Sequence, residues 1–348
     1  MQNLALRPIA GQRKFWPRSE FNLLLSTLDI SAESFVPNGL HRDTRNWIES
    51  NCYIDMWIEI LHALKLDPLA CFGFSLTADF EQDQWTFLKP PLVDLRRLYG
   101  LVVEEMNVWL PLIDHCENQV RAGRLVTAEV DAFYLPDTSQ SDYQRVHTKT
   151  TIAINQIDRS GRFLGYFHNA GYYQLEGDDF DGIFSETQTH AESGLPPYCE
   201  LIKLTRCHQK SQQELRVLSR QIAVEHMAFR PARNPIAAMA AEIEASLSRV
   251  VSDGDALTHA WVFSNLRQLG AGYELAALYL NWLSDGREKV LDDVAQQFME
   301  IGTVAKKLVL KVARMSARGQ YQDISEAMAG IATLWDSAYE KLETGLSA

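Results

Sequence analysis

Cys52 and His147 are the two side chains whose types and order in the chain best fit nucleophilic catalysis. Cys52 stands where an amphipathic helical pattern begins, and His147 follows in a segment that favours an extended strand. The N-terminal end of a helix carries partial positive charge, which favours a thiolate over a thiol. A cysteine nucleophile also needs a base within hydrogen-bond reach. The pair therefore predicts acyl transfer through a covalent thioester on Cys52.

Further polar residues are expected to complete such a site. Asn169 is our third member, because a side-chain amide can accept the imidazole N–H and fix its tautomer. Asp131 is the alternative residue that could orient the ring. An oxyanion site needs N–H donors aimed at the developing charge. The backbone N–H of Cys52 is the natural donor, with the side chains of Asn51 and Asn46 as further candidates.

Each of these residues also has an ordinary structural interpretation. Free cysteines are among the most buried residues, so Cys52 could be a core thiol. His147 could be a solvated strand histidine, and His168 is its competitor as the base. Asn169 precedes Ala170-Gly171 and could simply occupy a turn. The sequence leaves these alternatives open.

Substrate-binding residues are expected outside this group. Arg267 and Gln268 are polar residues in an otherwise apolar helical run, where they could face the first domain and hold substrate. Their alternative is a buried structural network. Tyr134 is a third substrate-binding candidate. We expect no metal site, because the adjacent His115 and Cys116 lack a second pair of ligands.

The elements that must position these residues fall into two parts, which we predict to be an α+β fold. A lead-in over residues 1–45 precedes a domain over 46–195 that combines a helix carrying Cys52 with antiparallel strands. An all-helical domain over 196–348 follows a linker at residues 194–198. The expected helices cover residues 47–64, 92–99, 209–229, 235–252, 257–284, 287–319 and 324–346, and the expected strands 125–135, 143–154 and 163–175.

Composition excludes several classes of function. The chain of 348 residues has a formal net charge of −12 and no basic stripe, so nucleic acid is not an expected partner. No stretch approaches the roughly 20 apolar residues that span a bilayer, and residues 1–10 do not resemble a signal peptide. Five scattered cysteines without a paired motif favour reduced thiols. We therefore expect a cytoplasmic protein that does not associate with a membrane.

Several segments resemble the bacterial family known as domain of unknown function 1839, and the resemblance extends over nearly the whole chain. More distantly, the layout is similar to the butirosin-pathway acyltransferase and to papain-like peptidases, in which a cysteine at a helix start precedes a histidine on a strand. The segments that carry the family resemblance are residues 51–55, 83–87, 129–138, 147–151, 165–173 and 267–270.

The distant resemblance implies an activity. The butirosin-type enzyme moves an aminoacyl group from a carrier-protein thioester to an amine. Here it implies a papain-like domain in which Cys52 and His147 transfer an acyl or aminoacyl group to a small-molecule or peptide amine. The partner would be a carrier protein bearing phosphopantetheine, with no cofactor bound directly, and a homodimer is considered. The alternatives are a peptidase, amidase or thioester hydrolase with the same residues, and a non-catalytic carrier-protein binding protein.

Overall fold

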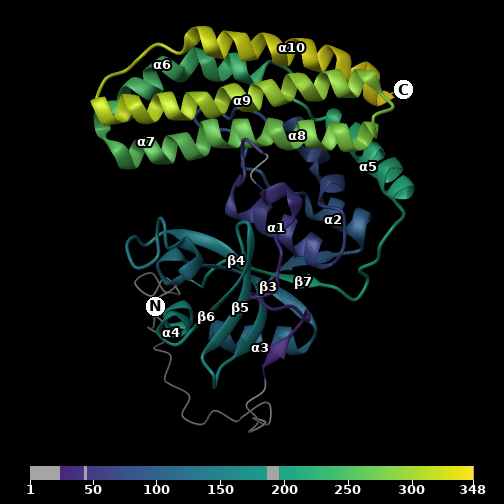
Figure 1. The fold of residues 1–348 in the computed structure, drawn as a ribbon, viewed down its shortest axis with the longest axis vertical. Helices are drawn as coiled ribbons and strands as arrows, with labels where there is room; N and C mark the ends of the chain where they lie inside the picture. Colours follow the sequence, from purple (N-terminus) through teal and green to yellow (C-terminus); the bar gives the residue numbers. More distant parts are fainter. Residues whose placement is uncertain (1–23, 43–44, 186–195, 348) are drawn as a thin grey trace, which may run out of the picture.

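The structure is a computed structural model that describes residues 24–42, 45–185 and 196–347. An antiparallel sheet with flanking helices forms one part, and long packed helices form the other (Figure 1). Helices α1 (Cys52–Ala63) and α2 (Leu92–Tyr99) lie between the sheet and the long helices (Figure 1). The predicted α+β class, with a helical second part, is confirmed at this level.

The sheet positions the histidine and its neighbours. The described residues form a sheet of seven strands. Six of them lie in the order β2-β7-β3-β4-β5-β6, and the seventh, the short β1, pairs with β4 off this path. All the pairings are antiparallel. The strands are β1 (Leu25–Ser26), β2 (Val102–Glu105), β3 (Arg124–Asp131), β4 (Lys149–Asp158), β5 (Phe163–His168), β6 (Gly171–Glu176) and β7 (Cys199–Lys203).

Alternation along the strands gives the sheet two apolar faces. On β3, Val126 belongs to a core that also contains residues of α3 (Leu112–Arg121). Leu125 points the other way and belongs to the core that contains α1. The sheet is therefore covered on both faces, and side chains on the face of Leu125 lie in the layer that holds Cys52.

Some sequence expectations shift in the structure. The predicted helix 47–64 begins later, because the side chain of Asn51 caps α1 at Cys52. His147 lies just before β4 rather than inside a strand. The predicted strand 163–175 is a hairpin of β5 and β6, and Asn169 in its turn has a φ of 43°. An asparagine tolerates this left-handed conformation better than most residues do.

The sheet extends beyond the boundary predicted at residue 195, which itself lies outside the described residues. Strand β7 pairs with β2 and β3, so residues 199–203 belong to the first part of the fold. Pro196-Pro197 precedes a strand and does not separate two domains. Most of the lead-in 1–45 also lies outside the described residues, but Leu25 pairs with β4.

The helical part contains α5 to α10. The predicted helix 257–284 is divided by a π-helical turn, Phe263–Arg267, and such turns occur frequently at functional sites. At Gly270 an added Cβ would lie 2.3 Å from the ring of Trp47, so glycine permits a close approach. The helices are α5 (Gln212–Met227), α6 (Pro235–Asp253), α7 (Asp255–Val262), α8 (Gln268–Ser284), α9 (Lys289–Arg318) and α10 (Ser325–Ser347), and a short α4 (Asp178–Phe184) follows β6.

Candidate active site

Cys52 is the first residue of α1. The Oδ1 atom of Asn51 accepts the backbone N–H groups of Tyr53 and Ile54, at 3.0 Å each. These bonds cap the helix and leave the Cys52 N–H without an acceptor among the described residues. Cys52 is partly exposed and stands at the positive end of the helix.

The other cysteines have different surroundings. Cys71, Cys116 and Cys199 are buried, and burial raises the pKa of each thiol, in Cys199 to about 12. These three stay protonated at neutral pH and have no access to substrate. Cys207 is partly exposed, and burial raises the pKa of its thiol as well. Cys52 alone among the five combines partial exposure with the first position of a described helix.

The helical part holds the chain that leads into Cys52. The Nε atom of Arg267 donates to the backbone oxygen of Ser50 at 2.6 Å, and the same guanidinium donates to the oxygen of Glu49 at 3.3 Å. The Oε1 atom of Gln268 accepts from Asn51 Nδ2 at 3.1 Å and from the backbone N–H of Leu88. Both residues thus face the sheet part as predicted, and they contact the backbone around Cys52. Their role toward a substrate stays a prediction.

A buried ionic group supports α1 from within. His41 lies between Asp55 and Glu59, with its Nε2 atom 3.4 Å from Asp55 Oδ1 and its Nδ1 atom hydrogen-bonded to Glu59. Burial lowers the pKa of His41, but the hydrogen bonds and charges of both carboxylates outweigh it and raise the pKa to about 9. The Oδ2 atom of Asp55 also accepts the Ser50 N–H at 2.6 Å. The imidazolium therefore stabilises the helix and the turn that precedes Cys52.

A second buried carboxylate lies beside the start of α1. Glu200 on β7 accepts the hydroxyl of Tyr53 at 2.6 Å and that of Tyr198 at 2.9 Å. Lys89 donates to it at 3.2 Å, with its ammonium 4.4 Å from the centre of the Tyr53 ring. Thr127 on β3 adds a longer contact of 3.4 Å. These bonds attach the first turn of α1 to the central strands.

His147 is held by Asp131. Its Nδ1 atom lies 2.5 Å from Asp131 Oδ2, and its ring stacks on Phe133 with 4.4 Å between the centroids. The imidazole side chain is 68% exposed. Because Nδ1 is bound to the carboxylate, Nε2 is the ring nitrogen that stays free to bind another group.

Strand alternation relates Asp131 to Cys52. Thr127 and Asp131 are four residues apart on β3, so their side chains leave the same face of the sheet. Thr127 reaches Glu200, which binds Tyr53 of α1. The Asp131–His147 pair is therefore anchored on the face that carries Cys52. Within the described residues, no hydrogen bond joins the Cys52 sulfur to the His147 ring.

The remaining predicted residues lie elsewhere. Asn169 stays in the β5–β6 turn, and no hydrogen bond joins it to His147 in the described part of the chain. His168, the competing histidine, is buried and binds Asp137 and Thr150, at 2.6 and 2.8 Å. It lies in the other layer of the sheet beside Tyr166, so it cannot serve Cys52.

Two proposed oxyanion donors need correction. The amide of Asn46 donates to Thr303 on α9 at 2.9 Å, because the chain turns there toward the helical part. The amide of Asn51 is buried and fully engaged by its capping bonds, Leu88 and Gln268. Tyr134 packs its ring against Gly182 of α4. The amides of Asn46 and Asn51 are thus engaged by other partners, and the role of Tyr134 toward a substrate stays a prediction.

Sequence reasoning missed His41, Glu200 and Lys89. One signal was present for His41. Asp55 and Glu59 are spaced by one helical turn in a strongly apolar helix, and two buried carboxylates require a cation beside them. Glu200 gave no comparable signal, because the residues that satisfy it come from distant parts of the chain.

The described residues contain no group of three or more His, Cys, Asp or Glu placed to hold a metal ion. Across the same residues, no helix is long and apolar enough to cross a membrane. An antiparallel sheet with a capped cysteine helix, joined to a bundle of long helices, defines a two-part α+β protein. The chain belongs to the DUF1839 family: residues 36–204 match its N-terminal domain and 212–344 its C-terminal domain. A comparison with curated proteins finds no match.

Proposed function

We propose that the protein is a cysteine-dependent acyltransferase that moves an acyl or aminoacyl group from a phosphopantetheine thioester to an amine. One observation carries the proposal. Cys52 is the partly exposed first residue of a capped helix, and the Asp131–His147 pair is anchored on the sheet face that this helix covers. A cysteine helix packed against an antiparallel sheet also supports a papain-like relationship for this domain.

The chemistry would proceed in two transfers. The Cys52 thiolate attacks the thioester carbonyl, and the Cys52 N–H donates to the oxyanion that develops. The carbon–sulfur bond to pantetheine breaks, and the leaving thiolate takes a proton from the His147 imidazolium. The amine then attacks the new thioester on Cys52, His147 accepts its proton, and the Cys52 thiolate leaves. The amide product carries the acyl group.

His147 must move toward Cys52 for these proton transfers. It lies in a segment without helix or strand, between Thr138 and Lys149, and most of its ring is exposed. A segment with little buried surface can change conformation at low cost. Catalytic hydrogen bonds also tighten when substrate binds. Because Asp131 contacts the Nδ1 atom of His147, it is the group that we assign to orient the imidazole, in place of Asn169.

Basic residues near Cys52 support a phosphate-bearing substrate. Arg267 binds the backbone of Ser50, and Lys306 on α9 lies with its ammonium 4.5 Å from the centre of the Trp47 ring. Burial and the charge of Arg267 lower the pKa of Lys306. Arg267 lies 3.7 Å from a carboxylate oxygen of Glu49, whereas no carboxylate of the described residues forms an ion pair with Lys306. Two neighbouring cations in a chain of net charge −12 would attract the phosphate of a pantetheine arm.

The first test is intact-mass analysis after brief iodoacetamide treatment at pH 6. We expect single labelling that disappears in Cys52→Ala, slows in His147→Ala and is unchanged in Cys207→Ser, which removes the other partly exposed thiol. Labelling no faster than that of an ordinary thiol, and unaffected by His147→Ala, would reject the catalytic pair. The non-catalytic binding protein would then be the better interpretation.

The second test offers an acylated pantetheine with and without an amine. We expect a mass increase on Cys52 that is discharged faster when the amine is added, together with amide formation. Discharge at the same rate in both samples, with release of the free acid, would assign the protein as a hydrolase. Arg267→Gln and Lys306→Gln should weaken the use of phosphopantetheine more than that of pantetheine without phosphate.

A further inference from the structure

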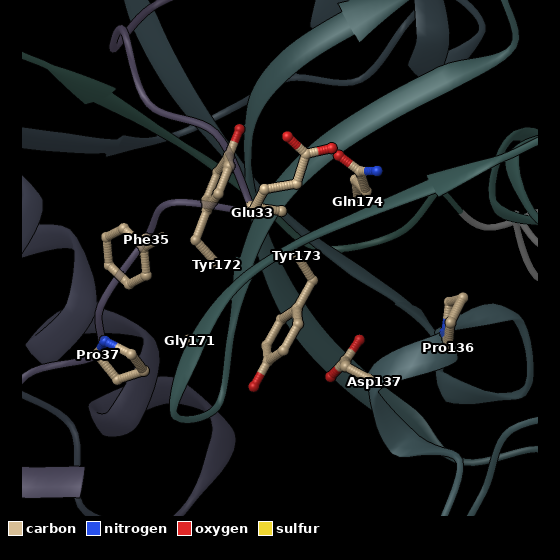
Figure 2. Close-up of a pocket in the computed structure, with 10 residues that line it drawn as sticks. Glu33, Phe35, Pro37, Pro136, Asp137, Gly171, Tyr172, Tyr173 and Gln174 are labelled. Carbon is tan, nitrogen blue, oxygen red and sulfur yellow. The ribbon is translucent and has the colours of Figure 1, made fainter.

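A cavity of about 490 Å³ lies at the free edge of strand β6. The loop containing Glu33 and Pro37 covers one side, the strand residues Gly171 to Gln174 form the floor, and Pro136-Asp137 close the far side (Figure 2). Pockets of roughly 300–1,000 Å³ suit small ligands. The volume is thus adequate for a small organic molecule.

Aromatic rings dominate the wall. Phe35, Tyr172 and Tyr173 line the cavity. In the view of Figure 2 the Tyr173 ring lies between Phe35 and Asp137. Phe35 is fixed by its edge contact with Phe167, at 5.9 Å between centroids, and by Tyr172 at 5.8 Å. Tyr172 and Tyr173 are neighbours on β6, so their rings leave opposite faces of the strand, and Phe35 lies on the side of Tyr172. Packing on both faces of the sheet holds these rings in place. Ring faces of this kind attract cations.

A buried carboxylate stands at the far side. Asp137 has a side chain only 3% exposed, and it accepts the Tyr166 hydroxyl at 2.5 Å and contacts His168 Nδ1 at 2.6 Å. The second ring nitrogen of His168 lies 2.8 Å from the hydroxyl of Thr150. Both carboxylate oxygens are engaged in this network, which holds the Asp137 side chain in place at the wall of the cavity.

The charges of the wall have one sign. Glu33 is exposed at the cavity and Asp137 is buried, while none of the ten lining residues is Lys, Arg or His. The hydroxyl of Tyr173 has no hydrogen-bond partner among the described residues. Burial, then the charges of Asp137, Glu49 and Glu59, raise the pKa of Tyr173 to about 12, so it remains a neutral phenol at physiological pH.

We propose that this cavity binds a small organic cation, an ammonium group attached to an apolar or aromatic body. The ammonium would lie beside the Asp137 carboxylate and the Tyr173 ring, and the body would extend past Gly171 at the free edge of β6 toward Phe35. A carboxylate together with aromatic faces is the combination that recognises organic cations. The inference does not depend on catalysis by Cys52, and it assigns a site that the acyl-transfer proposal does not use.

Three probes that share a benzene ring and differ in charge test whether binding in this cavity requires a cation. Benzylammonium, benzyl alcohol and benzoate are titrated into the full-length protein, and binding is measured by saturation-transfer NMR and calorimetry. We expect benzylammonium to bind at least about tenfold more tightly than the other two, since a single favourable ion contact is worth roughly that factor. Equal binding of all three, or preference for benzoate, would overturn the proposal.

Variants of exposed residues locate the site without endangering the fold. Gln174 lines the cavity and is exposed, so Gln174→Arg should weaken benzylammonium binding several-fold and Gln174→Glu should strengthen it. Glu33→Gln should weaken it, whereas Glu176→Gln, an exposed position on the same strand outside the lining, should have no effect. Cys52→Ser should bind the probe normally. If neither Gln174 variant changes binding, the proposed site is wrong.

Discussion

The Nδ1 atom of His147 lies 2.5 Å from Oδ2 of Asp131, and the other carboxylate oxygen accepts the backbone N–H of Thr148 at 3.2 Å. One carboxylate thus fixes both the ring and the backbone of the segment that carries it. The contact also determines which ring nitrogen is free. A base held through Nδ1 presents Nε2 to its partner, as in hydrolases that use a carboxylate to orient histidine.

Removing the charge of Asp131 should slow the reaction of Cys52 with iodoacetamide. We expect Asp131→Asn to reduce the rate at pH 6 by about tenfold, because the imidazolium that stabilises the thiolate loses its partner. Glu129→Gln is the matched control, since Glu129 lies on the same strand but pairs with Lys149. Asn169→Ala should change the rate by less than about twofold if Asp131 orients the ring. A large loss in Asn169→Ala alone would reverse this assignment.

The cap at Asn51 should matter for stability and for reactivity. Asn51→Ala removes the acceptor for two helix N–H groups, and we expect a loss of about 1–2 kcal/mol in the free energy of unfolding. Asn234→Ala removes the equivalent cap of α6 and should cost a similar amount. Only the Asn51 variant should alter alkylation of Cys52. Urea unfolding and labelling rates on both proteins check this, and equal effects on labelling would contradict it.

The stability of the protein should depend on pH through His41. Its pKa of about 9 in the fold exceeds the value near 6.5 of a free histidine, so its contribution is complete below pH 6.5 and disappears as the pH rises through 9. At pH 6, His41→Gln should destabilise the protein by about 3 kcal/mol, from the size of this shift.

The measurement for His41 is urea unfolding of wild type and variant at pH 6 and pH 10. The difference between the two proteins should shrink at the higher pH. His259→Gln, at an exposed position on α7, should give a small difference at both values. A gap for His41→Gln that is constant with pH would show that its ionisation does not stabilise the fold.

Two glycine substitutions test the close approach between the helical part and the turn before α1. Gly270→Ala places a methyl group against the Trp47 ring and should destabilise the protein by about 1–3 kcal/mol through overpacking. Gly330→Ala lies on α10 with no atom within 4 Å of the added Cβ. It should be neutral or stabilise by up to about 1 kcal/mol, from helix propensity. Thermal unfolding of both variants is sufficient, and equal melting temperatures would refute the steric argument.

Local signals allowed part of this fold to be predicted from the sequence. The helix at Cys52, the helices after residue 209 and the strand at 125–131 follow from periodicity and from caps. The predicted start of α1 was too early. Residues 47–50 continue the apolar pattern of the helix, but the helix begins only after its cap, Asn51. The place of β7 in the sheet could not be predicted, since this five-residue strand is stabilised by its pairing with β2 and β3, which lie far from it in the sequence.

The candidate site was predictable in its residues but not in its contacts. Cys52 and His147 could be chosen from residue type and order, and Asp131 was considered beside Asn169. The partners that hold α1 could not be found in this way. His41 binds Glu59 across 18 positions and Tyr53 binds Glu200 across 147, and such pairings depend on tertiary packing that single-sequence patterns do not encode.

The apolar core that contains α1 does not stop at the border between the two matched family domains. Trp57 of α1 shares it with Tyr279 of α8 and Phe298 of α9. Separating the chain between residues 204 and 212 would therefore expose apolar surface of this core to water on both parts. The two matched domains are therefore divisions of the sequence that share one apolar core. We therefore expect the protein to fold as one unit and neither half to be stable when it is expressed alone.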